Sequence, residues 1–142
     1  MNVGVIFAFA AAITWGLVYA IDQKILGSVS PLTLLFVNSA VTTILLVPFV
    51  VLSSHSMRFL EKADATTIAL IIVALLLAAA ANFLLFSSIA EIGASSASII
   101  EIAYPFFVVI FTMMFFGIAP TIPFLIGGLL IFLGSTIIIY YQ

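Results

Sequence analysis

The stretch TTIALIIVALLLAAAANFLLFSSIA, residues 66–90, contains no charged side chain, no proline and no glycine. An α-helix rises 1.5 Å per residue, so about 20 apolar residues cross the hydrocarbon core of a bilayer. A helix also satisfies its own backbone hydrogen bonds, which lipid cannot do. Residues 66–90 therefore predict a transmembrane helix.

Four further apolar runs lie on either side of this stretch, and turn signals separate them. A serine before a proline at Ser30-Pro31, the acidic Asp64, Gly93 and the segment 117–123 mark the boundaries. We predict an all-α integral membrane protein forming a single domain over residues 1–142, with helices at about 3–25, 32–53, 66–90, 95–117 and 121–141.

The composition supports this class and excludes several others. The chain is 66% hydrophobic and 6% charged, whereas a soluble domain is roughly 25% charged. It has no cysteine, and its single histidine, His55, lies in a polar loop, so we expect no metal and no cofactor. A net charge of −2 gives no reason to expect nucleic acid as a partner. An enzyme is the least favoured class, because the sequence shows no paired carboxylates with a nucleophile, no metal-ligand cluster and no phosphate-binding loop.

The basic residues barely bias the orientation. With five helices the termini lie on opposite sides; Arg58 and Lys62 fall on the side of Met1 (face A), and Lys24 falls on the other (face B). The positive-inside rule then predicts a cytoplasmic N-terminus in the cell (inner) membrane, by two charges against one. Such a chain is able to insert in both orientations, which allows an antiparallel homodimer.

Glu101 is the polar residue with the greatest predicted significance. It lies about five residues, roughly 7–8 Å, from the middle of the run 95–117. A charge at such a depth costs about 2.5 kcal/mol or more, so an intramembrane carboxyl is a functional-site hypothesis by default. We expect it to exchange a proton or bind a cation. The alternative is a protonated carboxyl that only packs against a neighbouring helix.

Other polar and aromatic residues share helix faces with one another. Pro105 follows Glu101 by four residues and cannot donate to its carbonyl, which predicts a kink, and Ser98, Val108 and Thr112 lie on the same face with Tyr104 beside it. Trp15, Tyr19 and Asp22 share a face of the first helix. The predicted substrate- and proton-binding set is Glu101, Tyr104, Pro105, Ser98, Trp15, Tyr19, Asn38 and Asn82.

Two further groups have simpler interpretations. Asp22 and Glu91 fall at helix ends on face B, where we expect solvated carboxylates. In the last helix Gly127, Gly128 and Gly134 form a small-residue face, which lets membrane helices approach closely. We interpret this face as a packing or dimerisation surface.

Several segments in order resemble the EamA-type repeat of the drug/metabolite transporter superfamily. They are residues 12–24 with Trp15-Gly16, Ser30-Pro31-Leu-Thr33, residues 86–98, Pro105 in the fourth helix, and residues 127–134. The resemblance implies one five-helix repeat that pairs as an antiparallel homodimer into a ten-helix transporter. This chain departs from the repeat where an arginine often stands, here Asn38, and where a Gly-Glu pair often ends the fourth helix, here Gly117-Ile118-Ala119. Glu101 is therefore not the motif glutamate.

These observations together predict a half-size secondary transporter for small organic metabolites or cations. It would work by alternating access as an antiparallel homodimer, with Glu101 as the coupling carboxyl. The alternative is a non-transporting membrane subunit whose small-residue face binds another membrane protein.

Overall fold

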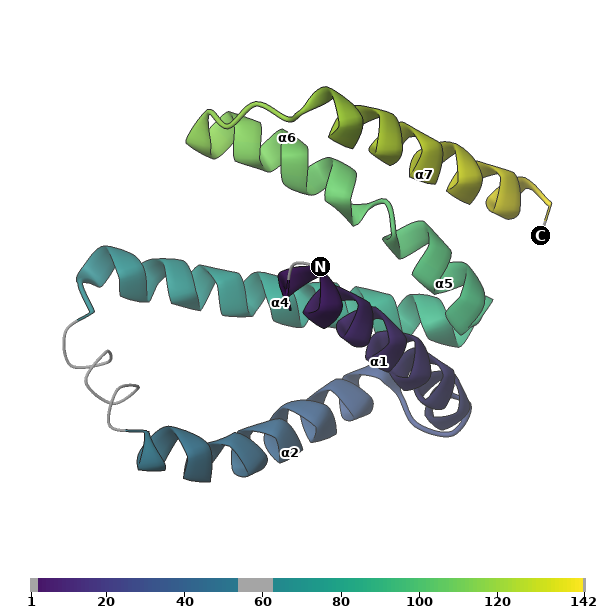
Figure 1. Ribbon diagram of the computed structural model, residues 1–142. Helices are drawn as coiled ribbons and strands as arrows, with labels where there is room; N and C mark the ends of the chain where they lie inside the picture. Colours follow the sequence, from purple (N-terminus) through teal and green to yellow (C-terminus); the bar gives the residue numbers. More distant parts are fainter. Residues whose placement is uncertain (1–2, 54–62, 142) are drawn as a thin grey trace.

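A computed structural model describes residues 3–53 and 63–141, and this described part is helical without strands. Its elements are α1 (Val3–Leu26), α2 (Pro31–Leu52), α4 (Ala65–Ile92), α5 (Ala94–Glu101), α6 (Tyr104–Phe116) and α7 (Ile122–Tyr140). Five spans, with α5 and α6 forming one of them, are long and apolar enough to cross a membrane. The predicted fold class and the predicted spans are confirmed to within a residue or two at each end (Figure 1).

Two helix starts follow from local chemistry. The Ser30 hydroxyl accepts from the Thr33 N–H at 3.1 Å, and Pro31 occupies the first turn of α2, where its missing N–H costs nothing. Asp64 caps α4 by accepting from the backbone N–H of Thr67 at 3.3 Å. The Thr67 hydroxyl also donates to this exposed carboxylate and lowers the pKa of Asp64 below its ordinary value. Both predicted caps are confirmed.

The α4–α5 corner depends on Gly93, whose φ of 82° lies in the region that residues with a Cβ rarely adopt. Gly93 has no side chain with which to cap α5. Gln23 of α1 does so instead, because its Oε1 accepts from the Ala94 N–H at 2.7 Å. This hydrogen bond places the end of α1 beside the start of α5.

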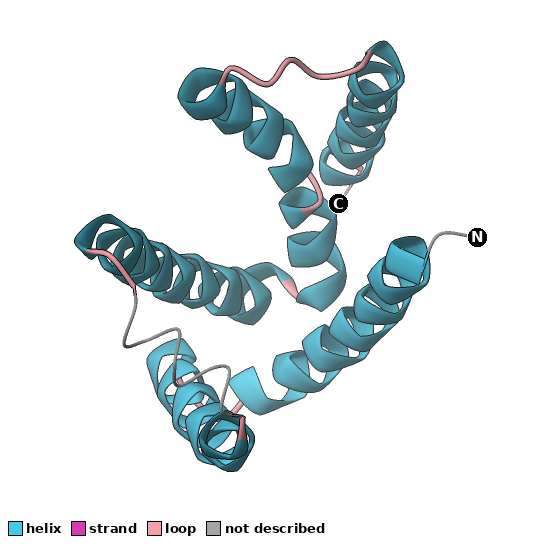
Figure 2. Cartoon of the chain, turned by 60° about the vertical axis from the view of Figure 1, so that its left-hand side comes forward, coloured by secondary structure: helices cyan, strands magenta, loops and turns pink. Residues whose placement is uncertain are grey.

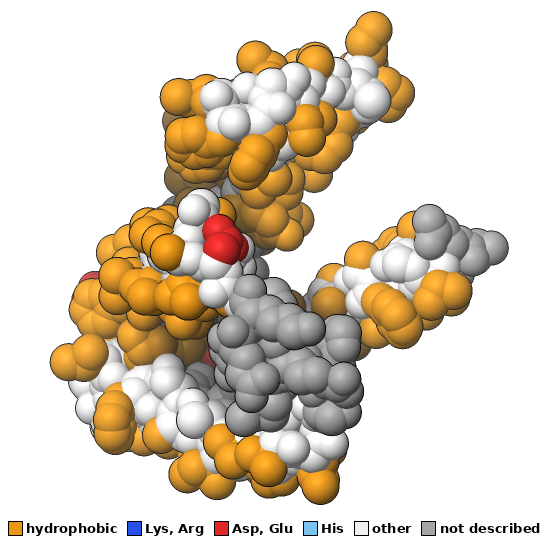
Figure 3. All heavy atoms as spheres, turned by 90° about the vertical axis from the view of Figure 1, so that its left-hand side faces the viewer, with side chains coloured by type: hydrophobic (Ala, Val, Ile, Leu, Met, Phe, Trp, Pro, Cys, Tyr) orange, Lys and Arg blue, Asp and Glu red, His pale blue; other side chains and the backbone are white. Residues whose placement is uncertain are grey.

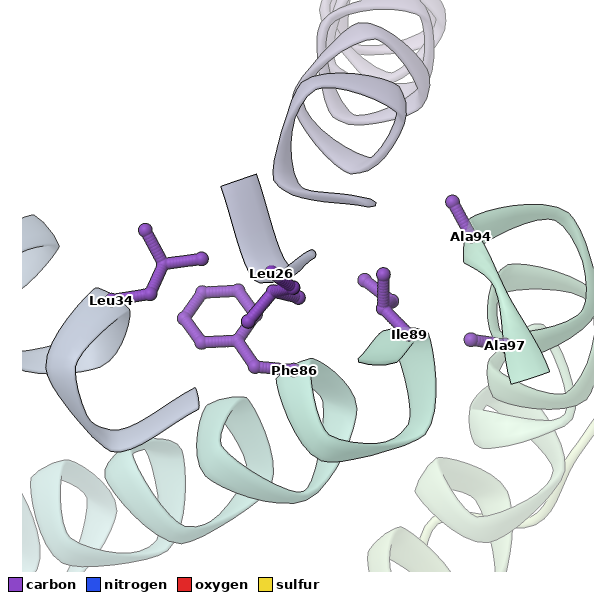
Figure 4. Packing of buried hydrophobic residues seen from close by; sticks show 6 residues of the cluster. All are labelled: Leu26, Leu34, Phe86, Ile89, Ala94 and Ala97. Carbon is purple, nitrogen blue, oxygen red and sulfur yellow. The ribbon is translucent and has the colours of Figure 1, made fainter. Parts of the chain in front are cut away.

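The buried core lies at this corner, where the ends of several helices meet. Ile89 is its most buried side chain, 1% exposed. The cluster comprises Leu26, Leu34, Phe86, Ile89, Ala94 and Ala97 (Figure 4). Helices α1, α2, α4 and α5 are therefore held together at one end, which corresponds to face B.

The fourth span is broken where the sequence predicted a continuous helix over 95–117 with a kink. Helix α5 ends at Glu101, Ile102 and Ala103 form a turn, and α6 begins at Tyr104. The physical reason is Pro105, which cannot donate to the carbonyl of residue 101 and whose ring clashes with that carbonyl in a continuous helix. The break therefore falls in the turn preceding the proline.

Helices α6 and α7 lie side by side and stand away from α1, α2 and α4 (Figures 1 and 2). The rings of Phe106 and Phe132 connect the two helices at 6.5 Å between centroids. Their main attachment to the rest is the buried Ser135 of α7, whose hydroxyl donates to the Ile99 carbonyl of α5 at 3.1 Å. The hairpin α6–α7 is thus joined to the other helices chiefly through α5.

The surfaces of the spans are apolar. In Figure 3 the coloured side chains on one face are mostly hydrophobic, with one small acidic patch. The accessible surface of the chain is 11088 Å², against about 7100 Å² for a compact monomer of this mass. Much apolar surface therefore remains for lipid or for another protein chain to cover.

The Gly93 corner gives a stability prediction. Gly93→Ala places a Cβ on a residue with positive φ, so we expect the free energy of unfolding to fall by about 1–2 kcal/mol. Gly16→Ala is the matched control, since a Cβ there meets nothing within 4 Å inside a regular helix. Thermal unfolding in detergent measures both, and equal midpoints for the two variants would contradict the role of Gly93.

Candidate functional site

A cavity of about 710 Å³ lies between α1, α4 and the α5–α6 junction. Small residues at helical spacing make room for it: Ala12 and Gly16 on α1, and Ala78 and Ala81 on α4. Its polar and aromatic lining consists of Trp15, Tyr19, Asn82, Ser98, Glu101 and Tyr104. The structure therefore brings together most of the residues that the sequence predicted as a binding set.

A hydrogen bond from α1 fixes the Glu101 carboxylate on the cavity wall. The Tyr19 hydroxyl of α1 donates to Oε2 of Glu101 at 2.7 Å, and both side chains are half-buried. The Trp15 ring lies 5.5 Å from that of Tyr19 between centroids, tilted by 50°. A carboxylate acceptor, a phenol and an indole thus lie within one small region of the cavity.

The helix break sets the positions of Glu101 and Tyr104. Glu101 is the last residue of α5 and Tyr104 the first residue of α6, with the Ile102–Ala103 turn between them. Irregular backbone at membrane depth is tolerated where it is buried in protein or lines a cavity. Pro105 has no N–H to donate to the Glu101 carbonyl, so this carbonyl lacks the hydrogen bond that a continuous helix would give it.

One amide and one hydroxyl of the cavity lining already donate hydrogen bonds within their own helices. The Asn82 amide donates to the Ala78 carbonyl at 2.9 Å, and the Ser98 hydroxyl donates to the Ser95 carbonyl at 3.0 Å. The side-chain carbonyl of Asn82 keeps its acceptor capacity. The cavity is therefore richer in acceptors than in donors, which suits a cationic or donor-rich ligand.

Some predicted residues lie outside the cavity lining. Asn38 is exposed on α2, and Pro105 shapes the break without lining the cavity. On α7 the glycines Gly127, Gly128 and Gly134 are half-buried, and a Cβ at each would meet nothing within 4 Å. The assignments of Asn38 and of the glycine face stay predictions.

Asp22 differs from the sequence-based expectation of a solvated carboxylate. It is 4% exposed, and its Oδ2 is buried without a hydrogen-bond partner in the described part of the chain. Its helix neighbours Tyr19 and Leu26 face the core, and this i−3, i+4 spacing was the signal available in the sequence. Glu91, the other helix-end carboxyl, is exposed as predicted.

The loop that holds two of the three basic residues lies outside the described residues. His55, Arg58, Glu61 and Lys62, and the apolar Phe59 and Leu60, belong to residues 54–62. The predicted topology therefore rests on sequence alone. Within residues 3–53 and 63–141, no three His, Cys, Asp or Glu side chains gather as they would to hold a metal ion.

The model of the EamA-like transporter family matches residues 2–140, nearly the whole chain. The chain belongs to this family. Comparisons with curated proteins and with solved structures each gave no match. Members of the EamA-like family are transporters and not enzymes, so the five apolar spans are those of a multi-pass membrane protein of the drug/metabolite transporter type. The suspected resemblance is confirmed.

The Tyr19–Glu101 hydrogen bond gives this EamA-like chain a stability prediction. Tyr19→Phe removes the donor that ties α1 to α5, and we expect the free energy of unfolding to fall by about 1.5–3 kcal/mol, as for other hydrogen bonds to a charged group. Tyr140→Phe is the control, because Tyr140 is 81% exposed at the end of α7. Denaturation in mixed micelles followed by circular dichroism measures both. A Tyr19→Phe variant as stable as the control would show that the bond contributes nothing.

Proposed function

We propose that this chain is a half-size secondary transporter of small organic cations or other small metabolites in the cell membrane, with Glu101 as the residue that binds both the proton and the substrate. The observation that carries the proposal is the Tyr19–Glu101 pair, which lies in an aromatic cavity within the membrane-spanning part. The family supplies the general class, and the cavity supplies the chemistry.

The electrostatics of the cavity favour exchange of a positive charge at Glu101. A lone carboxylate at membrane depth is costly, and a proton or an organic cation removes that cost. Tyr19 stabilises the ionised form by donating to Oε2. The rings of Trp15, Tyr19 and Tyr104 can stabilise a cation further, since aromatic faces attract quaternary ammonium groups. A proton and a cation therefore compete for one site, which is the basis of exchange transport.

The open side of the cavity supports pairing with a second copy. Trp15 is 51% and Tyr104 60% exposed, so one chain leaves two of its aromatic lining residues largely uncovered. The large accessible surface and the separated α6–α7 hairpin also support pairing with a second copy. Such a partner would close the site and form the second half of an alternating-access transporter.

An inverted partner fits the charge distribution. One basic residue, Lys24, lies on face B, and two, Arg58 and Lys62, lie in the segment assigned to face A. Orientation follows the excess of basic residues, so a difference of one leaves both insertions accessible. The half-buried glycines of α7, with open space at each Cβ, offer a surface for close helix contact in the pair.

Transport in liposomes tests the role of Glu101. We expect purified protein to take up labelled benzyltrimethylammonium against a pH gradient, and Glu101→Gln to slow uptake by about 100-fold or more. The probe has a fixed charge, so any proton dependence comes from the protein. Glu91→Gln is the control, because Glu91 is exposed at the end of α4. Uptake by wild type no faster than by empty liposomes, or equal uptake by Glu101→Gln, would contradict the proposal.

Cysteine labelling tests the inverted pairing, since the chain has no native cysteine. Ser28→Cys reports face B and Ala65→Cys reports face A, and both positions are exposed. In an antiparallel dimer we expect a membrane-impermeant maleimide to label about half of each variant in intact cells, and the rest only after permeabilisation. Complete labelling of one variant with none of the other would establish a single orientation and exclude the inverted homodimer.

A further inference from the structure

We propose that Asp22 is a second proton-binding carboxyl of this protein, loaded from face B and electrostatically coupled to Glu101. Its part in transport rests on the transporter function proposed above, whereas its proton binding does not. The proposal starts from the buried carboxyl of Asp22, which has no role in the exchange proposed at Glu101.

The surroundings of Asp22 cannot stabilise a permanent negative charge. The side chain is 4% exposed, and Oδ2 has no hydrogen-bond partner among the described residues. Tyr19 and Leu26, its neighbours on the same face of α1, pack against or belong to the apolar core. An ionised carboxylate buried in this way, with one oxygen that accepts no hydrogen bond, has a high free energy, and binding a proton lowers it.

No cation among the described residues offers an alternative partner. On α1, Lys24 is exposed; on α4, Glu91 is exposed; on α5, the titratable residue is Glu101. Helix α2 has no titratable side chain. The lack of a metal-type cluster around Asp22 in the described part leaves the proton as the ligand that fits a single carboxyl among apolar side chains.

The depths of the residues place Asp22 between face B and Glu101. The Gln23–Ala94 hydrogen bond sets the end of α1 beside the start of α5. Asp22 lies four residues, about 6 Å, from the last residue of α1, and Glu101 lies seven residues, about 10 Å, from the first residue of α5. Tyr19 is one turn deeper than Asp22 and donates to Glu101. From face B the order is therefore Asp22, Tyr19, Glu101.

The two carboxyls influence one another through this arrangement. Tyr19 lies about one turn from Asp22 on the same face of α1, and its hydroxyl donates to Glu101 at 2.7 Å. A negative charge on one carboxyl disfavours a negative charge on the other in a medium of low dielectric constant. A proton bound at Asp22 from face B therefore favours ionised Glu101, the form that binds a cation.

Infrared difference spectroscopy of the full chain in lipid bilayers tests proton binding without any substrate. We expect a protonated-carboxyl band that changes with pH and is missing in Asp22→Asn, but is retained in Glu101→Gln and in the control Glu91→Gln. Asp22→Leu is the second variant, because an apolar side chain suits this buried position even if the amide does not fold. A band unchanged in both Asp22 variants would overturn the proposal.

Transport then tests the role of that proton. We expect both Asp22 variants to bind benzyltrimethylammonium but to lose about tenfold or more of the uptake driven by a pH gradient. Gradient-driven uptake equal to wild type would show that Asp22 has only a structural role and would overturn the coupling. If wild type transports no cation, the proposed function fails, while the infrared result still decides whether Asp22 binds a proton.

Discussion

The hydrogen bond between the Tyr19 hydroxyl and the Glu101 carboxylate joins the parts of this molecule that matter for its function. It links α1 to the end of α5 at 2.7 Å and lies on the wall of the cavity. A charged-group hydrogen bond contributes about 1.5–3 kcal/mol, comparable with the cost of placing a carboxylate at this depth. The two free energies are therefore similar, so binding of a proton or a cationic ligand decides the charge state of Glu101.

The break in the fourth span follows from the same local chemistry. Pro105 disrupts the helix one turn after Glu101, so the Ile102–Ala103 turn separates α5 from α6 at the cavity wall. Glu101 stays with the helices packed at the Gly93 corner, while Tyr104 belongs to the α6–α7 hairpin. A site whose residues belong to two differently attached parts changes shape when those parts move, as alternating access requires.

Much of the fold could be predicted because its signals are local. Span length and hydropathy gave the helices, and the chemistry of Ser30 and Asp64 gave two of their starts. Helical spacing also grouped Trp15 with Tyr19, and Ser98 with Glu101.

One sequence could not supply the packing between helices. Asp22 was expected to be solvated because it lies near a helix end, and only the packing shows that its face of α1 is covered. Asn38 is exposed on α2 and lies outside the cavity lining, so its role stays a prediction. The sequence predicted a kink and not a break, because a proline indicates where a helix is disturbed but not whether the helix bends or is interrupted.

Binding of benzyltrimethylammonium at several pH values tests the central claim that a proton and a cation compete at Glu101. Trp15 is the single tryptophan of the chain and lines the cavity, so its fluorescence reports occupancy. We predict saturable binding whose affinity falls as the pH falls, because protonation neutralises the carboxylate that attracts the probe. Binding with the same affinity across the whole pH range would contradict the account.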